Sequence, residues 1–179
     1  MSLLIQYTIL YASVLILVAL GGCFSEHSGV INLGLEGIMV MGALGGALTM
    51  KYLEGSSPVT IVILTIIAAA VTGLVFSALL AVACINFKAD QTIVGTALNM
   101  LGLAAATVIV KAINTAESPD NVSATVQYIA QKKAFLVNIG DFTFNWMMLV
   151  ALVLLIAAYI VLYKTKFGLR LMSCGEHPQ

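Results

Sequence analysis

The sequence predicts an all-α integral membrane protein with about five transmembrane helices. Of its 179 residues, 61% are apolar and 9% are charged, and the mean hydropathy is +1.06. Ordinary soluble domains are roughly 45–50% apolar and about 25% charged. A soluble fold of this length cannot bury so much apolar surface. The composition therefore excludes a cytosolic enzyme, a nucleic-acid-binding protein and a disordered tail.

Five apolar stretches approach the length of about 20 residues that a helix needs to cross the hydrocarbon core. They lie at about residues 5–24, 38–53, 58–85, 92–113 and 146–163. The second stretch is short and rich in glycine, and Gly42 and Gly46 predict that another helix approaches it closely. Pro58 suits the first turn of a helix. We expect a single membrane domain over residues 1–179.

One long polar stretch, residues 114–145, joins the fourth and fifth spans. It predicts an extramembrane loop with room for a short helix or a hairpin, and the Ser-Pro-Asp-Asn sequence at 118–121 predicts a turn. Lys164, Lys166 and Arg170 follow the last span and predict a cytoplasmic C-terminal end, with the N-terminus outside after five crossings. The Lys and Arg residues of the whole chain divide evenly between the two sides, so the orientation depends on that cluster.

Residues 25–37 join the first two spans and combine three glycines with polar side chains. These include Glu26, His27, Asn32 and Glu36. Because glycine tolerates irregular backbone, such a segment can fold back into the protein at membrane depth. The alternative is an interfacial loop with Glu36 solvated near the headgroups. If the segment is helical, Asn32 and Glu36 share one face and form a polar pair.

Two polar residues mark the beginning and the interior of the fourth span. Asp90 precedes it and is expected to cap the free amide groups of the helix. Asn99 lies about two turns inside, where a primary amide in hydrocarbon costs several kcal/mol unless it finds partners. Asn99 therefore faces other helices or a cavity. Its residue type favours a contact between helices and a contact with substrate equally.

No catalytic or metal-binding motif is present in the sequence. His27 and His177 are isolated, and there is no HExxH motif, no paired-carboxylate arrangement and no GxxxxGK[ST] nucleotide loop. Cys23, Cys84 and Cys174 are widely separated and are interpreted as packing residues or free thiols. An alternative for Cys23 is lipidation after processing, but no basic region precedes it.

Three motifs resemble those of permease subunits of ABC importers of the branched-chain amino acid and simple-sugar type. Residues 25–37 are similar to the signature after the first span, and their Asn-Leu-Gly-Leu-Glu-Gly core resembles the nucleoside-importing branch, as does the run 89–99. Residues 165–170 and 175–179 resemble the start of the cytoplasmic loop that docks the ATPase. His27 replaces the usual Arg, and Cys174 replaces a small aliphatic residue. The family continues beyond Gln179 through further spans, so the resemblance implies the N-terminal part of a permease.

The resemblance implies a multi-pass protein of the bacterial plasma (inner) membrane that imports nucleosides. Its partners would be a second permease subunit, two ABC ATPase subunits that use ATP, and an external solute-binding lipoprotein, with no cofactor in this chain. By position in the matching motifs, the residues expected near the substrate path are Asn32, Glu36, Asp90, Gln91 and Asn99. Those expected in the ATPase-docking region are Gly168, Arg170, Glu176 and His177.

Three other functions stay open at this point. The same mechanism could serve riboflavin or a simple sugar, because specificity in such systems also resides in the external receptor. An ion-coupled secondary carrier would use Asp90 and Glu36 to bind its cation. A structural membrane protein would use the embedded polar residues only to hold helices together.

Overall fold

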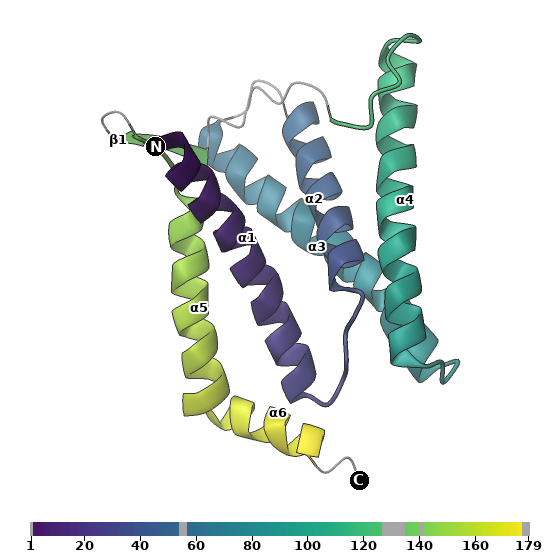
Figure 1. Cartoon of the computed structure of the whole chain (residues 1–179), viewed down its shortest axis with the longest axis vertical. Helices are drawn as coiled ribbons and strands as arrows, with labels where there is room; N and C mark the ends of the chain where they lie inside the picture. The colour runs from purple at the N-terminus through teal and green to yellow at the C-terminus, as the bar shows by residue number, and fades with distance from the viewer. Residues whose placement is uncertain (1, 54–56, 127–134, 140–141, 177–179) are drawn as a thin grey trace. The chain divides into compact units, whose positions relative to one another are not determined.

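The computed structural model of the chain describes residues 2–53, 57–126, 135–139 and 142–176. The described part forms six helices and one small hairpin (Figure 1). The elements in chain order are α1 (Ser2–His27), α2 (Leu35–Tyr52), α3 (Pro58–Ile85), α4 (Gln91–Glu117), β1 (Leu136–Ile139), β2 (Phe142–Asn145), α5 (Met147–Lys164) and α6 (Lys166–Glu176). The all-α membrane class predicted from composition is confirmed.

Each of the five predicted spans coincides with a helix. In the described part, α1, α3, α4 and α5 are long and apolar enough to cross a membrane. Helix α2 has 18 residues but includes Glu36 and Lys51, and it is not among those four. The expected limits of the fourth span and of the loop were wrong, because α4 continues to Glu117 and takes up residues 114–117.

Two helices begin at the residues that their sequences predict. Ser57 caps α3 by accepting a hydrogen bond from the amide of Thr60 at 3.4 Å, and Pro58 occupies the first turn. The Asp90 carboxylate caps α4 by accepting from the amide of Thr92 at 2.8 Å. Both caps satisfy amide groups that lack a partner within the helix.

The polar stretch before α5 contains the expected turn and a hairpin. The amide of Asn121 donates to the carbonyl of Ser118 at 2.9 Å, which closes the turn. Strands β1 and β2 pair antiparallel, with Leu136 opposite Asn145. The rings of Phe135 and Trp146 stack at the base of the hairpin, with centroids 6.3 Å apart.

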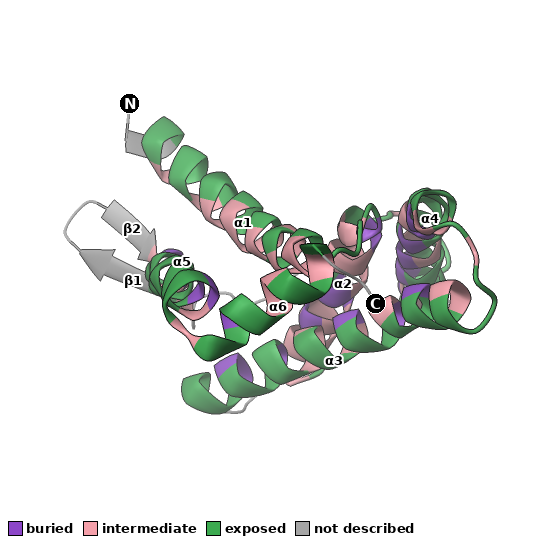
Figure 2. Ribbon diagram, turned by 90° about the horizontal axis from the view of Figure 1, so that it is seen from below, coloured by how far each residue is buried: buried purple, intermediate pink, exposed green. Residues whose placement is uncertain are grey.

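The chain divides into two compact units, each described here by itself. Unit 1 comprises Met1–Asn32 and Phe135–Gln179, and unit 2 comprises Leu33–Ala134. In unit 1, α1 packs beside α5, and α6 contacts both helices near their C-terminal ends (Figures 1 and 2). The chain passes from unit 1 to unit 2 inside the glycine-rich segment 25–37, after Asn32, and it returns to unit 1 at Phe135.

Unit 2 is a bundle of α2, α3 and α4 in which α2 contacts both other helices. A Cβ atom at Gly42 would lie 3.2 Å from the carbonyl oxygen of Ala69, and one at Gly46 would lie 3.4 Å from Thr65. The predicted close approach at Gly42 and Gly46 is therefore confirmed, and the helix that approaches is α3. Leu44, Ala106 and Val110 form a small core between α2 and α4.

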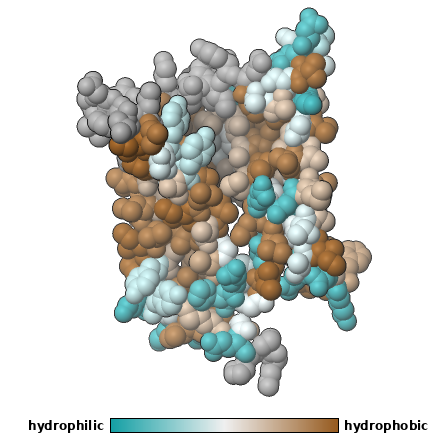
Figure 3. Space-filling view, viewed as in Figure 1, coloured by the Kyte–Doolittle hydropathy of each residue, from teal (hydrophilic) through white to brown (hydrophobic). Residues whose placement is uncertain are grey.

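The apolar surface of both units is mostly exposed. Over α1 and α5, apolar side chains form a broad band (Figure 3), and none of the membrane-span window of α1 is buried. Exposed residues on these helices include Leu15, at 66%, and Leu152, at 59%. Lipid or further protein is the surrounding that such a surface requires, because water would oppose its exposure.

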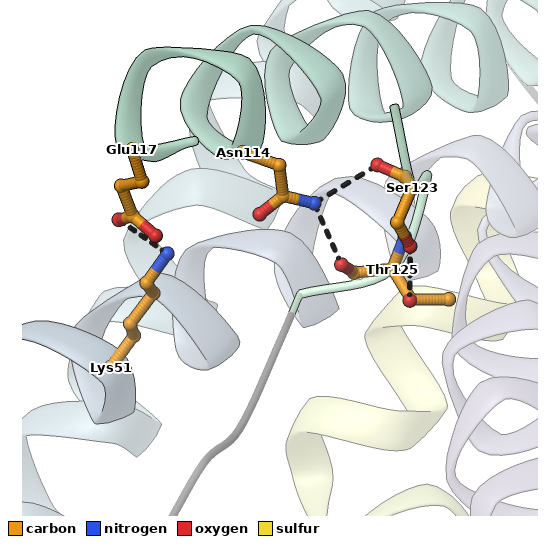
Figure 4. A network of polar contacts seen from close by, with 5 residues as sticks. All are labelled: Lys51, Asn114, Glu117, Ser123 and Thr125. Carbon is orange, nitrogen blue, oxygen red and sulfur yellow. Dashed lines mark hydrogen bonds and ion pairs between the residues drawn. The ribbon is translucent and has the colours of Figure 1, made fainter. Parts of the chain in front are cut away.

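The C-terminal ends of α2 and α4 are tied together by polar contacts (Figure 4). Lys51 of α2 forms an ion pair with Glu117 of α4. Asn114 is 1% exposed, and its amide nitrogen donates to the carbonyls of Ser123 and Thr125, both at 2.9 Å. The side chain of Asn114 thus folds the start of the loop back onto α4.

We expect Asn114→Leu to lower the free energy of unfolding by about 1–3 kcal/mol, because it leaves two carbonyls without their donor. Thermal unfolding in detergent measures the change. The matched control is Thr115→Val, since Thr115 is exposed and makes one long hydrogen bond, of 3.4 Å, to the carbonyl of Asn121. Equal stability of the two variants would contradict this role for Asn114.

Candidate functional site

The candidate site of unit 2 is built around Asn99, which holds the start of α2. The side-chain oxygen of Asn99 accepts a hydrogen bond from the amide of Gly37 at 2.8 Å, and its nitrogen donates to the carbonyl of Leu33 at 2.6 Å. Helix α2 begins with Gly34 at its N-cap, and no side chain of its own caps it. The Asn99 amide from α4 therefore supplies partners that the start of α2 lacks. Of the two roles open from the sequence, the contact between helices is the one observed.

The start of α2 lies well inside the length of α4. Asn99 follows Gln91, the first residue of α4, by eight residues, which is about 12 Å along a helix. A Cβ atom at Gly95 would lie 3.0 Å from Leu33 and 3.1 Å from the amide of Gly34. The end of the glycine-rich segment thus packs against the side of α4 in unit 2, as a segment that folds back into the protein would.

Glycine is required where α2 and α4 meet. A Cβ atom at Gly37 would lie 2.6 Å from the carbonyl oxygen of Leu98, and one at Gly102 would lie 2.8 Å from the Cα atom of Gly37. These neighbours are backbone atoms, which cannot rotate away as a side chain can. The absence of side chains at Gly37 and Gly102 is therefore what brings the Asn99 amide within hydrogen-bonding distance of α2.

The predicted substrate-path residues occupy different places. Glu36 is exposed in the first turn of α2, next to Gly37. Asp90 is exposed and caps α4, and Gln91 is the first residue of that helix, so both lie about two turns from Asn99. Asn32 precedes α2, which begins only at Leu35, so the condition under which Asn32 and Glu36 would share a helical face is not met.

The predicted docking residues fall on α6, a helix that the sequence reasoning did not anticipate. Gly168 is buried, Arg170 and Glu176 are exposed, and His177 lies outside the described residues. The signal for this helix was present in the sequence, since Phe167 and Leu171 are spaced by four residues and Gly168 and Gly175 by seven. The stretch is too short and too polar to cross a membrane.

The described residues of unit 1 include an apolar groove, and the described part of the chain contains no metal-binding cluster. Among all the described residues, no three His, Cys, Asp or Glu side chains gather closely enough to hold a metal ion. A groove in unit 1 is lined by apolar residues of α1 and α5, including Leu17 and Ala157. It lacks the hydrogen-bonding groups that a polar solute requires.

Comparison of the sequence with known proteins identifies the family of the chain. Residues 4–179 match the family described as branched-chain amino acid transport system / permease component. The chain is 37% identical over 187 residues to the guanosine ABC transporter permease protein NupQ of Bacillus subtilis, covering 99% of this chain and 57% of that protein. It is 34% identical over 185 residues to the nucleoside ABC transporter permease protein NupC of Lactococcus lactis, covering 100% of this chain and 57% of the relative.

A third relative, from Haloferax volcanii, is provisionally named a glucose ABC transporter permease protein, TsgC13. It is 29% identical over 182 residues, covering 98% of this chain and 52% of the relative. No solved structure matches the chain. The chain spans a little over half the length of these relatives. The match over residues 4–179 shows that the chain belongs to the branched-chain amino acid transport system permease family.

Proposed function

We propose that this chain is part of a permease subunit of an ATP-driven ABC importer for nucleosides. The observation that carries the proposal is the likeness along the whole chain to two permeases named for guanosine and nucleoside transport. The family indicates a permease of a transport system. The names of those two relatives favour a nucleoside as the solute. The alternative solute is a simple sugar, which the name of the Haloferax volcanii relative favours.

Glu36 is the residue that we assign to the substrate path. It is exposed in the first turn of α2. That turn packs against the side of α4, about two turns from the N-terminal end of α4. A carboxylate that faced lipid in the centre of a span would cost about 2.5–3.5 kcal/mol on insertion scales. A passage filled with water avoids this cost. There the carboxylate can accept hydrogen bonds from the hydroxyl groups of a ribose.

Asn99 affects the substrate path indirectly, because it holds the start of α2. Both ends of its amide are used by the backbone at Leu33 and Gly37. It is therefore a positioning residue, which fixes the first turn of α2 and with it the direction of the neighbouring Glu36. Asp90 has a similar indirect role, because its carboxylate is occupied with the amides of Thr92 and Ile93.

The remaining components follow from the class of transporter. A second permease subunit would cover the exposed apolar helices and complete the passage, two ABC ATPase subunits would supply the energy of ATP, and an external solute-binding lipoprotein would deliver the nucleoside. The cluster of Lys164, Lys166 and Arg170 favours a cytoplasmic position for α6 at a bacterial plasma membrane, with the N-terminus outside. Arg170 and Glu176 are exposed on α6 and available to the ATPase.

Uptake by the complete importer in vesicles tests the proposed function. We expect nucleoside uptake that requires ATP and the loaded receptor, with excess unlabelled nucleoside competing and glucose or riboflavin not competing. Uptake driven by an ion gradient without ATP would favour a secondary carrier. ATP-dependent uptake of glucose alone would keep the mechanism and replace the solute, and no flux of any solute would leave a structural role.

Substitution of Glu36 tests the path assignment. We expect Glu36→Gln to raise the KM for nucleoside about tenfold or more, because hydrogen bonds to a charged acceptor contribute about 1.5–3 kcal/mol. The matched control is Glu26→Gln, which removes an exposed acid of the same segment. An unchanged KM for Glu36→Gln would remove this residue from the path.

Asn99→Leu should destabilise the permease by about 1–3 kcal/mol and reduce uptake, because the amide of Gly37 and the carbonyl of Leu33 lose their partners. Thr96→Val is the control on the same helix, since the Thr96 hydroxyl bonds only carbonyls of α4 itself, those of Thr92 and Ile93. Melting temperature in detergent and uptake by the complete importer are the two measurements. If Asn99→Leu matched wild type in both measurements, the hydrogen bonds of Asn99 to Gly37 and Leu33 would have no importance for transport.

A further inference from the structure

Helix α6 packs closely against α5 and the end of α1 through two glycines on one of its faces. Gly168 and Gly175 are seven residues apart, which is about two helical turns. At Gly168 a Cβ atom would overlap the carbonyl group of Leu162 at the end of α5. At Gly175 a Cβ atom would lie 2.6 Å from the carbonyl oxygen of His27 and 3.0 Å from the amide nitrogen of Gly29. One end of α6 thus rests on α5 and the other on the end of α1.

The contact between Gly29 and Gly175 joins backbone to backbone. A Cβ atom at Gly29 would lie 2.9 Å from the Cα atom of Gly175, so neither position has room for a side chain. Gly29 also has a φ of +80°, a conformation that residues with side chains rarely adopt. Two independent features, the spacing and the backbone angle, therefore require glycine at position 29.

The end of α1 at this contact is held by its own hydrogen bonds. The hydroxyl of Ser25 donates to the carbonyl of Val30 at 2.7 Å, and the amide of Val30 donates to the carbonyl of Ser25 at 3.2 Å. The ring of His27 lies edge-on to that of Tyr163 of α5, with centroids 6.1 Å apart. Residues 25–30 therefore form a closed hook against which Gly175 rests.

Only a few residues of chain separate this hook from the start of α2. Gly29 precedes Leu35, the first residue of α2, by six residues. On α6, Lys166, Arg170 and Ser173 are exposed, on the side of the helix opposite Gly168 and Gly175. A force applied to the exposed side of α6 acts on the hook through Gly175.

We propose that the Gly29–Gly175 contact is the mechanical link between the ATPase-docking helix and the glycine-rich segment that leads into the substrate path. The inference rests on the proposed function. Through this link, α6 and residues 25–30 move as one body when the ATPases close. The motion reaches α2 along the chain. Gly29 and Gly175 are positioning residues and touch no substrate.

Substitutions in the complete importer separate this link from simple folding. We expect Gly175→Ala to leave assembly with the ATPases and ATP hydrolysis within about twofold of wild type, and to reduce ATP-dependent uptake about tenfold. Gly29→Asn should give the same result, since Asn tolerates a positive φ and the variant adds mainly the clash with Gly175. Cys174→Ala, at an exposed neighbour on α6, should transport normally. Normal uptake by both glycine variants would overturn the proposal.

A cross-linking measurement applies even if the glycine variants fail to assemble. In an importer without Cys23 and Cys84, Ser28→Cys places a thiol beside Gly29, while native Cys174 lies beside Gly175. We expect a short bis-maleimide to link Cys174 to the new thiol equally well without nucleotide and with bound ATP, and the linked importer to keep transporting. A cross-linking yield that collapses with ATP would show that the contact opens, and it would overturn the proposal.

The two hypotheses fail in different ways. If the wild-type importer shows no ATP-dependent nucleoside uptake, the proposed function fails before any variant is examined. If wild type transports and the glycine variants transport equally well, the function stands and the link fails. Loss of ATP hydrolysis in parallel with uptake would place the glycines in assembly of the complex, and it would also overturn their role in coupling.

Discussion

The packing of unit 2 depends on one constraint. A helix that starts inside a bundle needs hydrogen-bond partners for its first backbone groups. Helix α2 begins against the side of α4, and no cap from its own sequence accepts or donates there. The amide of Asn99 meets the need by bonding the backbone on both sides of the first turn, at Leu33 and Gly37. Such a contact holds the start of α2 against α4 and gives its backbone groups the partners that they lack.

Small residues set the distances that make this contact possible. Gly37 and Gly102 let α2 and α4 approach until their backbones touch, and Gly42 and Gly46 do the same for α2 and α3. Because the short side chain of Asn99 cannot reach across a wider gap, its hydrogen bonds to α2 depend on the glycines. The C-terminal ends of α2 and α4 are fastened separately by Lys51 and Glu117.

The two units divide the expected tasks of a permease. Unit 2 contains the start of α2, where Glu36 is exposed and, under the proposed function, would contact the solute. Unit 1 contains α6, whose exposed Arg170 and Glu176 would contact the ATPase. The glycine-rich segment is one of the two covalent connections between them. Its sequence therefore has to satisfy packing demands at both ends, which explains why Gly29 and Gly37 each contact another backbone.

The sequence by itself determined the membrane class, the five apolar helices, the start of α3 at Pro58, the cap at Asp90, and the turn at residues 118–121. These depend on composition, length and neighbouring residues, which are local properties of the chain. Only the tertiary structure decided that Asn99 bonds α2, that Asn32 lies outside the helix of Glu36, and that α4 extends past Asn114. Those outcomes depend on which helices pack together and how closely, because an amide or a glycine has no defined role until another backbone reaches it.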